Sequence, residues 1–179
     1  MKQIGVGILG FGTVGAGVAD GLLRHREVMA RRLGVDIALR RIADLDITTD
    51  RGVAVPDGVL TTDAARVVAD PDVQIVVETI GGTGVAKKFV MDALNAGKCV
   101  VTANKKLLAE HGREIFDAAA ANGVDIYWGL PSAAGYRSSA SCGRASPATR
   151  SNPSTAYSTA PATTSSRAWK TRAFRSTRF

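Results

Sequence analysis

Three glycines with the spacing G-x-G-x-x-G, Gly10, Gly12 and Gly15, are the first residues of this 179-residue chain whose types and spacing suggest chemistry. In that pattern the first glycine makes a tight turn, the second lets the backbone approach a pyrophosphate, and the third allows close packing of helix on strand. The amides at the start of the helix would then receive the phosphates. The alternative is a glycine-rich connection that binds nothing, and the flanking strand and helix patterns argue against it.

An acid at the predicted end of the second strand is the next candidate. Asp44 follows the apolar run 36–43, where a carboxylate can accept a hydrogen bond from an adenosine ribose 2′-hydroxyl. Such an acid disfavours a 2′-phosphate, so it favours NAD over NADP. Arg40 and Arg41 lie nearby, however, and one of them could serve a phosphate. The alternative interpretation is that Asp44 is a solvated surface acid.

A lysine pair follows another predicted strand, in Thr102-Ala103-Asn104-Lys105-Lys106. Ligands bind at this edge of open α/β sheets, and a lysine there can hold a carboxylate or polarise a carbonyl. The alternative is a solvated pair that opens a helix. No set of residues has metal-ligand spacing, so no metal site is predicted. The two cysteines have no C-x-x-C spacing and fit a reducing, cytoplasmic setting.

The elements that must position these residues alternate between strands and helices. This order predicts an α/β fold, a Rossmann-like doubly wound parallel sheet with right-handed crossovers. The apolar run 4–19 contains five glycines before residue 16 and the polar Thr13, which argues against a membrane span. The predicted strands are 4–9, 36–43, 75–77, 99–102 and 126–128, and the predicted helices are 14–32, ending at Gly34, then 64–69, capped by Asp63, 85–96, capped by Gly97, and 112–122.

Charge divides the chain into two parts. The net charge of +7 arises entirely after Trp128, because residues 1–128 carry 15 Lys and Arg against 16 Asp and Glu, whereas residues 129–179 carry 8 against none. The second part has Leu130 as its only Leu, Ile, Val or Met, so it cannot build a core. We therefore predict a dinucleotide-binding domain over 1–128 and a disordered basic tail over 129–179.

Three segments of the first part resemble the cofactor domain of the homoserine dehydrogenase family. They are I-G-V-G-I-L-G-F-G-T-V-G at 4–15, V-V-E-T-I-G-G at 76–82, and V-T-A-N-K-K-L-L-A-E-H-G at 101–112. The resemblance covers residues 1–128 and implies interconversion of L-homoserine and L-aspartate 4-semialdehyde with NAD(H) or NADP(H), within threonine, methionine and isoleucine biosynthesis. It also implies a small-molecule substrate, a homo-oligomer when intact, and no membrane.

The resemblance assigns roles to individual residues. Lys105 matches the family lysine that reaches into the active site. NADP-using members often have Arg-Asp-Leu after the second strand, whereas this chain has Ala43-Asp44-Leu45, which favours NAD without excluding NADP. The residues that it implies to hold the cofactor or line its path are Gly10, Phe11, Gly12, Thr13, Val14, Gly15, Thr79, Gly81 and Gly82. Asp44, Thr102 and Asn104 complete the predicted cofactor-binding set.

After Trp128 the resemblance stops. Regrouping the bases of a back-translation in one shifted register allows A-A-V-G-G-G-I-P-I-I from Leu130 and I-Y-G-I-L-N-G-T-C-N-Y from Ser154, and both resemble family motifs. Loss of a single base after the Trp128 codon accounts for the junction. We therefore interpret 129–179 as a frameshifted translation, and the chain as an incomplete homoserine dehydrogenase that lacks its substrate domain and is inactive alone.

Two other functions are consistent with parts of the sequence. Another amino-acid-pathway dehydrogenase could share the first domain, but Asn104-Lys105 argues against it. A non-catalytic nucleotide-binding module with a nucleic-acid-binding tail would use the tail's eight positive charges and its interspersed aromatic residues. Arg-Gly and Arg-Ser repetition is absent, and the frameshift explains the composition more simply, so nucleic acid is not favoured as a partner.

Overall fold

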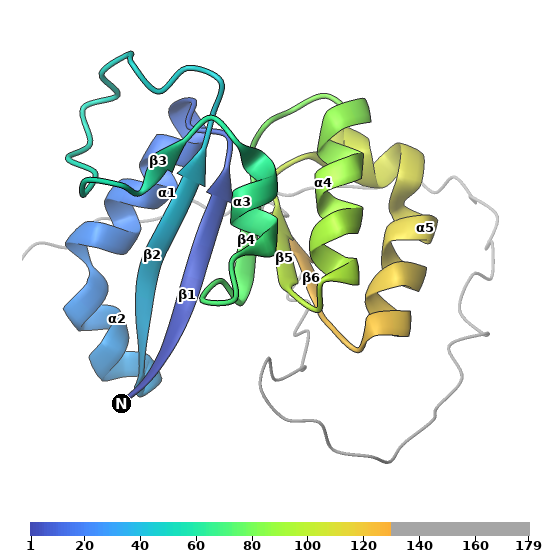
Figure 1. Ribbon diagram of the computed structural model, residues 1–179. Coiled ribbons are helices and arrows are strands. Elements are labelled where there is room, and N and C mark those ends of the chain that lie inside the picture. The colour runs from blue at the N-terminus through green and yellow to red at the C-terminus, as the bar shows by residue number, and fades with distance from the viewer. Residues whose placement is uncertain (130–179) are drawn as a thin grey trace, which may run out of the picture. The chain divides into compact units, whose positions relative to one another are not determined.

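The computed structural model describes residues 1–129, and a six-stranded sheet lies at their centre (Figure 1). The strand order is β3-β2-β1-β4-β5-β6, and every pairing is parallel. This confirms the predicted doubly wound sheet, whose order reverses between β1 and β4. The strands are β1 (Lys2–Leu9), β2 (Val35–Ala43), β3 (Leu60–Thr61), β4 (Ile75–Glu78), β5 (Cys99–Thr102) and β6 (Ile126–Trp128).

Helices pack on both faces of the sheet (Figure 1). One apolar cluster joins Val76 and Val100 of the sheet to buried residues of three helices, such as Val67 and Leu94. A second cluster, on the opposite face of the sheet, joins Val6 and Ile8 to Ala16 and Ala19 of the first helix. The helices are α1 (Thr13–Arg24), α2 (Arg26–Leu33), α3 (Ala64–Ala69), α4 (Gly84–Asn95) and α5 (Lys105–Asn122), of which α3, α4 and α5 contribute to the first cluster and α1 to the second.

Local signals set several helix ends as expected. Asp63 caps α3 by accepting a 2.9 Å hydrogen bond from the Ala65 amide. Gly34 ends α2 in the left-handed conformation with φ of 71°, which residues with a side chain rarely adopt. Gly97 is also left-handed, although the C-cap of α4 is Ala96 and Gly97 is the residue after it.

Two predicted helix boundaries are wrong, and one strand was not predicted. The helix predicted over 14–32 is two helices separated at His25, and the break allows Arg26 to bind Asp36 of β2 at 2.6 Å. The helix predicted over 112–122 begins seven residues earlier, at Lys105, where Asn104 caps it and Leu107 of the first turn is already buried in the core. The two-residue strand β3 is too short to give a periodic signal.

The amino-terminal edge of the sheet holds a buried lysine. Lys98, 7% exposed, donates 2.6 Å hydrogen bonds to the carbonyl oxygens of Asp70 and Val73. Burial lowers the pKa of its amine. Arg41 pairs with Asp70, which precedes β4, and Arg40 binds Gln3 at the start of β1. Both arginines therefore bind partners at this edge, away from Asp44, and neither is placed to serve a phosphate at the opposite edge.

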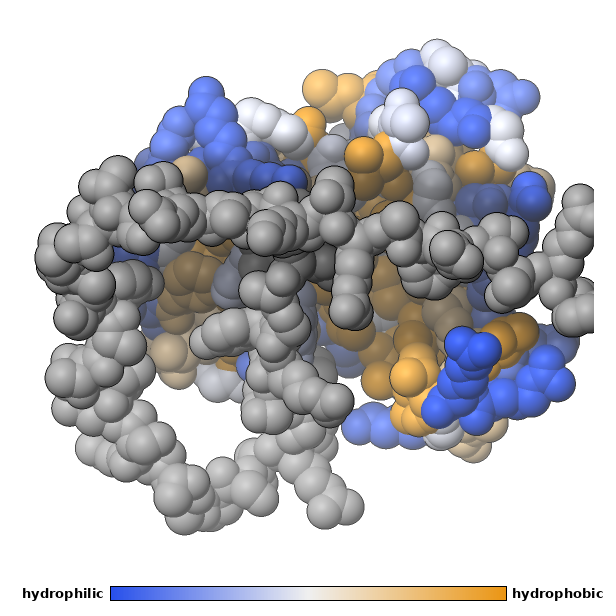
Figure 2. Space-filling model, turned by 180° about the vertical axis from the view of Figure 1, so that it is seen from behind, coloured by the Kyte–Doolittle hydropathy of each residue, from blue (hydrophilic) through white to orange (hydrophobic). Residues whose placement is uncertain are grey.

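The β4–β6 half of the sheet differs on its two faces. Val76, Val100 and Ile126 pack beneath α4 and α5, whereas Val77, Val101 and Tyr127 are half-buried on the other face. Seen from behind, the uncovered part of this face shows apolar surface between hydrophilic patches (Figure 2). None of the helices within residues 1–129 is both long and apolar enough to cross a membrane.

Candidate functional site

Two glycines of the loop between β1 and α1 are required by close backbone contacts. Gly10 has a φ of 98°, and a Cβ there would lie 2.9 Å from the Thr79 carbonyl carbon. A Cβ on Gly15 would lie only 2.0 Å from the Gly10 carbonyl oxygen. The chain therefore folds back on itself here, as the first and third glycines of the motif predict.

Gly12 has a different environment. Its φ of −72° is open to any residue, and a Cβ would meet nothing within 4 Å. Gly12 is the N-cap of α1 and makes no side-chain capping bond, so the positive end of the helix is not covered by a side chain. Thr13 and Val14, the first residues of α1, are exposed beside it. This geometry is that of an anion cradle open to solvent.

Phe11 and Asp44 fasten the loop to the sheet. The Phe11 side chain is buried in the cluster beneath α1, and its amide donates to Asp44 Oδ2. The other oxygen of Asp44 accepts a 2.9 Å hydrogen bond from the Asp46 amide. Asp44 thus lies where the sequence placed it, at the end of β2, but its carboxylate also holds the glycine loop. Each of its oxygens keeps a further lone pair for a ligand hydroxyl.

Hydrogen bonds connect the loops after β4 and β5. Glu78 is fully buried, and its Oε1 accepts from the amides of Ile80 at 2.8 Å and Gly81 at 3.3 Å. Its Oε2 accepts from the Thr102 hydroxyl at 2.5 Å. The Thr102 hydroxyl oxygen in turn accepts from the Asn104 amide at 3.0 Å. One carboxylate therefore fixes both loops.

Asn104 and Thr79 extend these bonds in two directions. Asn104 Oδ1 caps α5 by accepting from the Leu107 amide at 3.0 Å, while its Nδ2 donates to the Gly82 carbonyl. The Thr79 hydroxyl lies within hydrogen-bond distance of the carbonyls of Leu9, at 3.1 Å, and Gly10, at 2.9 Å. The resulting carboxyl-edge network, made of Glu78, Thr79, Thr102 and Asn104, joins the glycine loop to the start of α5.

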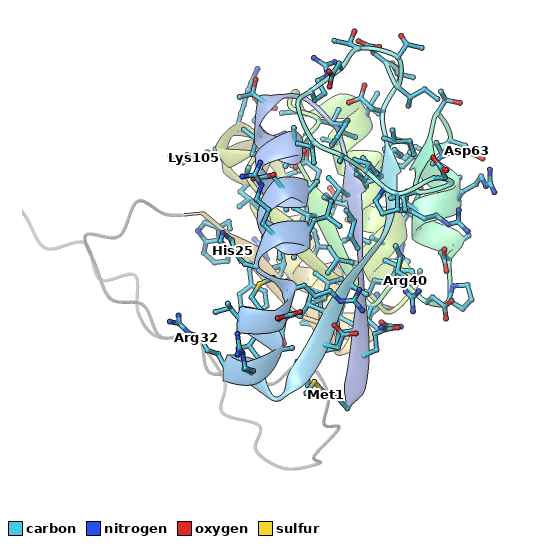
Figure 3. All side chains as sticks on the ribbon, turned by 90° about the vertical axis from the view of Figure 1, so that its left-hand side faces the viewer. Met1, His25, Arg32, Arg40, Asp63 and Lys105 are labelled. Carbon is cyan, nitrogen blue, oxygen red and sulfur yellow. The ribbon has the colours of Figure 1, made fainter. Side chains whose placement is uncertain are left out.

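Lys105 is the first residue of α5 and is exposed. It lies at the end of the domain opposite Met1 (Figure 3), and Asn104 beside it fixes the helix start. Lys106 is also exposed, but its amine lies 3.7 Å from Glu110 on the same helix. The two lysines are thus distinguishable, and Lys105 directly follows the carboxyl-edge network.

The N-termini of the helices separate into two kinds. Side chains of Asp63 and Asn104 cap α3 and α5. Three helices have no side-chain capping bond: α2 at His25, and the helices that follow β1 and β4, namely α1 at Gly12 and α4 at Thr83. Of these, α1 and α4 flank the crevice where the strand order reverses, which is where ligands of such sheets bind.

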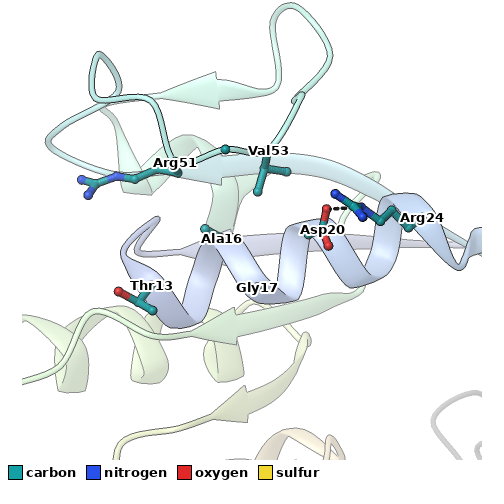
Figure 4. A pocket seen from close by; sticks show the side chains of 8 residues that line it. Thr13, Ala16, Gly17, Asp20, Arg24, Arg51 and Val53 are labelled. Carbon is teal, nitrogen blue, oxygen red and sulfur yellow. Dashed lines mark ion pairs between the residues drawn. The ribbon is translucent and has the colours of Figure 1, made fainter.

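A hollow of about 370 Å³ adjoins α1 on the side of the segment between β2 and β3 (Figure 4). Thr13 is the only predicted site residue that lines it. Across from α1 it is lined by Arg51, Gly52 and Val53, and Asp20 pairs with Arg24 at 2.6 Å on its helical wall. Arg51 binds Asp46 at 3.0 Å.

The residues that sequence reasoning missed are Glu78 and Arg51. Glu78 lies within the segment V-V-E-T-I-G-G at 76–82, but the sequence analysis assigned it no function. The sequence did contain a signal for it, because Glu78 ends a run of three apolar strand residues. An acid in such a place is buried, and acids are almost never fully buried unless they are bonded. Arg51 had no signal, because the segment that carries it has no periodic pattern.

Comparisons with known proteins agree with this geometry. The family described as "Homoserine dehydrogenase, NAD binding domain" matches residues 10–129. Homoserine dehydrogenase of Bacillus subtilis is 42% identical over 128 residues, which are 72% of this chain and 30% of that protein. Homoserine dehydrogenase of Methylobacillus glycogenes is 49% identical over 109 residues, covering 61% and 26% of the two chains.

Solved structures give the same result. A homoserine dehydrogenase from Thiobacillus denitrificans superposes with a TM-score of 0.66 at 46% identity, covering 72% of this chain and 30% of that one. A hyperthermophilic archaeal homoserine dehydrogenase in complex with NADPH has a TM-score of 0.53 at 24% identity over 70% of this chain and 43% of its own. The second comparison shows the shared fold.

Fold and site together define a Rossmann-type dinucleotide-binding domain. More particularly, the chain belongs to the homoserine dehydrogenase NAD-binding domain family. It spans about 30% of the length of relatives such as the Bacillus subtilis enzyme. The predicted family is therefore confirmed over the part of the chain that the structure describes.

Proposed function

We propose that this chain binds NAD or NADP across the carboxyl edge of its sheet and provides the cofactor half of a homoserine dehydrogenase. The observation that carries the proposal is the uncapped N-terminus of α1, open to solvent through Gly12 at the point where the strand order reverses. The cradle suits a pyrophosphate, because its amides and helix dipole favour an anion and Gly12 adds no side chain.

Titration of the purified chain with NAD⁺, NADH and NADP⁺ by calorimetry tests this proposal. We expect saturable binding with one site per chain. Gly12→Val should abolish binding, because its side chain would project into the open face of the cradle. Binding that is unchanged in that variant would place the dinucleotide elsewhere.

The proposed reaction interconverts L-homoserine and L-aspartate 4-semialdehyde. NAD(P)⁺, when bound, would supply the acceptor for the hydride from the carbon that bears the hydroxyl group, and the hydroxyl proton would pass to a base or to water. The chain's own part would be to hold the dinucleotide and to project Lys105 toward the substrate from the start of α5. The 179-residue chain alone should not oxidise homoserine, since the family takes most substrate contacts from a further domain.

Lys105 should affect chemistry more than cofactor affinity. In an enzyme that joins this domain to an in-frame substrate domain, Lys105→Ala should lower kcat/KM by orders of magnitude and leave the cofactor Kd nearly unchanged. Lys106→Ala is the matched control, because Lys106 is paired with Glu110 on the same helix. Equal loss of kcat/KM and cofactor affinity in Lys105→Ala would indicate a structural role instead.

Asp44 supports a preference for NAD over NADP. Asp44→Ala should weaken binding of both cofactors, because the Phe11 amide loses its acceptor. Asp44→Asn keeps an acceptor for that amide and removes the negative charge, so it should raise NADP affinity relative to NAD. An unchanged ratio of NAD to NADP affinity in Asp44→Asn would refute the ribose assignment.

The origin of residues 129–179 is a separate proposal. We infer a shift of reading frame after Trp128, on the grounds of the family motifs in the shifted register. The tail's predicted disorder and its nucleic-acid-binding alternative lie outside the described residues. Resequencing the locus across the Trp128 codon tests the frame directly. In the intact protein we propose a homo-oligomer in the cytoplasm.

A further inference from the structure

Glu78 is the only acid that is buried among the described residues. The other buried polar or charged residues there are Thr61, Lys98 and Thr102, and Lys98 bonds carbonyl oxygens at the opposite edge of the sheet. Burying a carboxylate is expensive unless the site supplies bonds for it. Its bonds hold the loops after β4 and β5 together, but that role does not by itself require a charged group.

The bonds of Glu78 are those of an ionised carboxylate. It accepts from two backbone amides and from the Thr102 hydroxyl. In the last bond Thr102 Oγ1 donates to Glu78 Oε2, while the same oxygen accepts from the Asn104 amide. An ionised carboxyl accepts at both oxygens, whereas a protonated one would need to donate at one of them.

No Lys, Arg or His of residues 1–129 forms an ion pair with this carboxylate. The three donors to Glu78 are neutral, and none of the ion pairs of the described residues includes it. The carboxylate therefore contributes a negative potential to its surroundings. Because Glu78 is fully buried, water screens that potential less than it would at the surface.

The position of Glu78 in the sheet determines which half of a bound dinucleotide lies nearer to its negative charge. Asp44 ends β2, on one side of β1, and marks the adenosine half by its proposed bond to the ribose. Glu78 ends β4, on the other side of β1, and is paired in register with Leu9 and Thr102. A dinucleotide that spans the crevice with its phosphates on α1 has its second nucleoside on the β4–β5 side.

We propose that Glu78 is a specificity-determining residue that favours the oxidised cofactor over the reduced one. The inference rests on the proposed function and deepens it. The nicotinamide ring carries a positive charge when oxidised and none when reduced, and the two forms are otherwise nearly the same size. A carboxylate without an ion-pair partner, at the end of β4 on that side of the crevice, therefore acts on the difference between them. We expect about a threefold to tenfold change in the ratio of the two dissociation constants, the size that Coulomb attraction between two partly screened unit charges gives.

The experiment measures the Kd of NAD⁺ and of NADH for the full 179-residue chain and compares their ratio among variants. Glu78→Gln keeps the shape, its oxygen can accept from the same two amides, and its NH2 group can donate to Thr102 Oγ1, but it removes the charge. It should raise the Kd of NAD⁺ relative to that of NADH by threefold to tenfold. Glu78→Asp keeps the charge on a shorter arm, so it should weaken both forms and preserve the ratio. Glu114→Gln, an exposed acid of α5 paired with Lys87, is the control for a change in net charge.

A measurement on the unaltered chain covers the case in which Glu78→Gln does not fold. Benzamide adenine dinucleotide is a neutral, planar isostere of NAD⁺. The unaltered chain should bind NAD⁺ more tightly than this analogue by a similar factor. Equal affinity for the two would overturn the inference without any variant.

The outcomes separate the inference from the function on which it rests. A lowered preference for NAD⁺ in Glu78→Gln alone supports it. Binding of both forms with an unchanged ratio in Glu78→Gln overturns it, leaves the dinucleotide site intact, and identifies Glu78 as a loop fastener only. If the unaltered chain binds neither form, the proposed dinucleotide site and this inference both fail.

Discussion

The glycine loop and the carboxyl-edge network lie at the same edge of the sheet but are built differently. The loop at Gly10–Gly15 gains its shape from missing side chains, with a glycine Cα held against the Gly10 carbonyl. The network gains its shape from side chains that bond across segments, with Glu78 and Thr102 joined over 24 residues. A phosphate needs open backbone amides, whereas a reacting centre needs groups held at fixed positions.

One part of the site therefore depends on the absence of side chains, and the other depends on hydrogen bonds between side chains. Adding an atom should damage the loop, and removing an atom should damage the network. The loop should also distinguish folding from binding, because Gly15 faces the protein and Gly12 faces open space.

The largest effect is expected for Gly15→Ala. The added Cβ would lie 2.0 Å from the Gly10 carbonyl oxygen, so the loop must move and stability should fall by about 3 kcal/mol or more. Urea denaturation measures the loss. Gly17→Ala is the matched control on the same helix, since a Cβ there meets nothing within 4 Å, and it should be neutral or stabilising. Comparable losses in the two variants would contradict the assigned contact.

Gly12→Val should separate binding from folding. Stability should fall by less than about 1 kcal/mol, because the position is an N-cap with no neighbour to displace. Dinucleotide binding should be lost. Calorimetry and denaturation on the same preparation check both halves of this expectation. Loss of the fold together with binding would show that Gly12, like Gly15, is needed for folding.

Asn104→Ala tests the network by removal. It deletes the cap of α5 and the bond to the Gly82 carbonyl, and we expect a loss of about 1 to 2 kcal/mol. Asn104→Asp keeps a capping oxygen but cannot donate to Gly82, so its loss should be smaller. Thermal unfolding of the pair distinguishes the two bonds. If the aspartate variant is as unstable as the alanine variant, the bond to Gly82 and not the cap is the larger contribution.

The smallest effect is expected outside both regions, at the exposed pair of Arg26 and Asp36. Hydrogen bonds from Arg26 and then from Gln3 hold the pKa of the Asp36 carboxyl below its usual range. A lowered pKa in the folded state stabilises the protein above the ordinary aspartate pKa of about 3.9, and this stabilisation is lost as the pH falls below it.

Arg26→Ala should therefore lower the Tm slightly at pH 7 and less at pH 3, with no change in cofactor affinity. Unfolding scans at the two pH values give the comparison. A difference in Tm that grows as the pH falls would have the wrong sign for this pair.

Sequence reasoning succeeded where a single residue imposes the structure. Gly10 and Gly34 occupy left-handed conformations, and Asp63 caps α3 with its own side chain, so each could be predicted locally. It failed where the cause lies in another segment. The break at His25 accompanies the pairing of Arg26 with Asp36, and the role of Glu78 depends on its bond to Thr102. Asp44 is an example of success and of failure. Its position at the end of β2 was predictable, whereas its bond to the Phe11 amide of another segment was not.

Chemical modification of the buried amine of Lys98 would measure how often this domain opens locally. Lys98 is 7% exposed, and its amine donates to two carbonyl oxygens of the turn before β4, those of Asp70 and Val73. An acylating reagent would modify the exposed Lys105 and Lys106 in the native state, but it would reach Lys98 only when the turn before β4 separates from the start of β5. The rate of acylation at Lys98, read by mass spectrometry, therefore reports how often these two strands part at their amino ends.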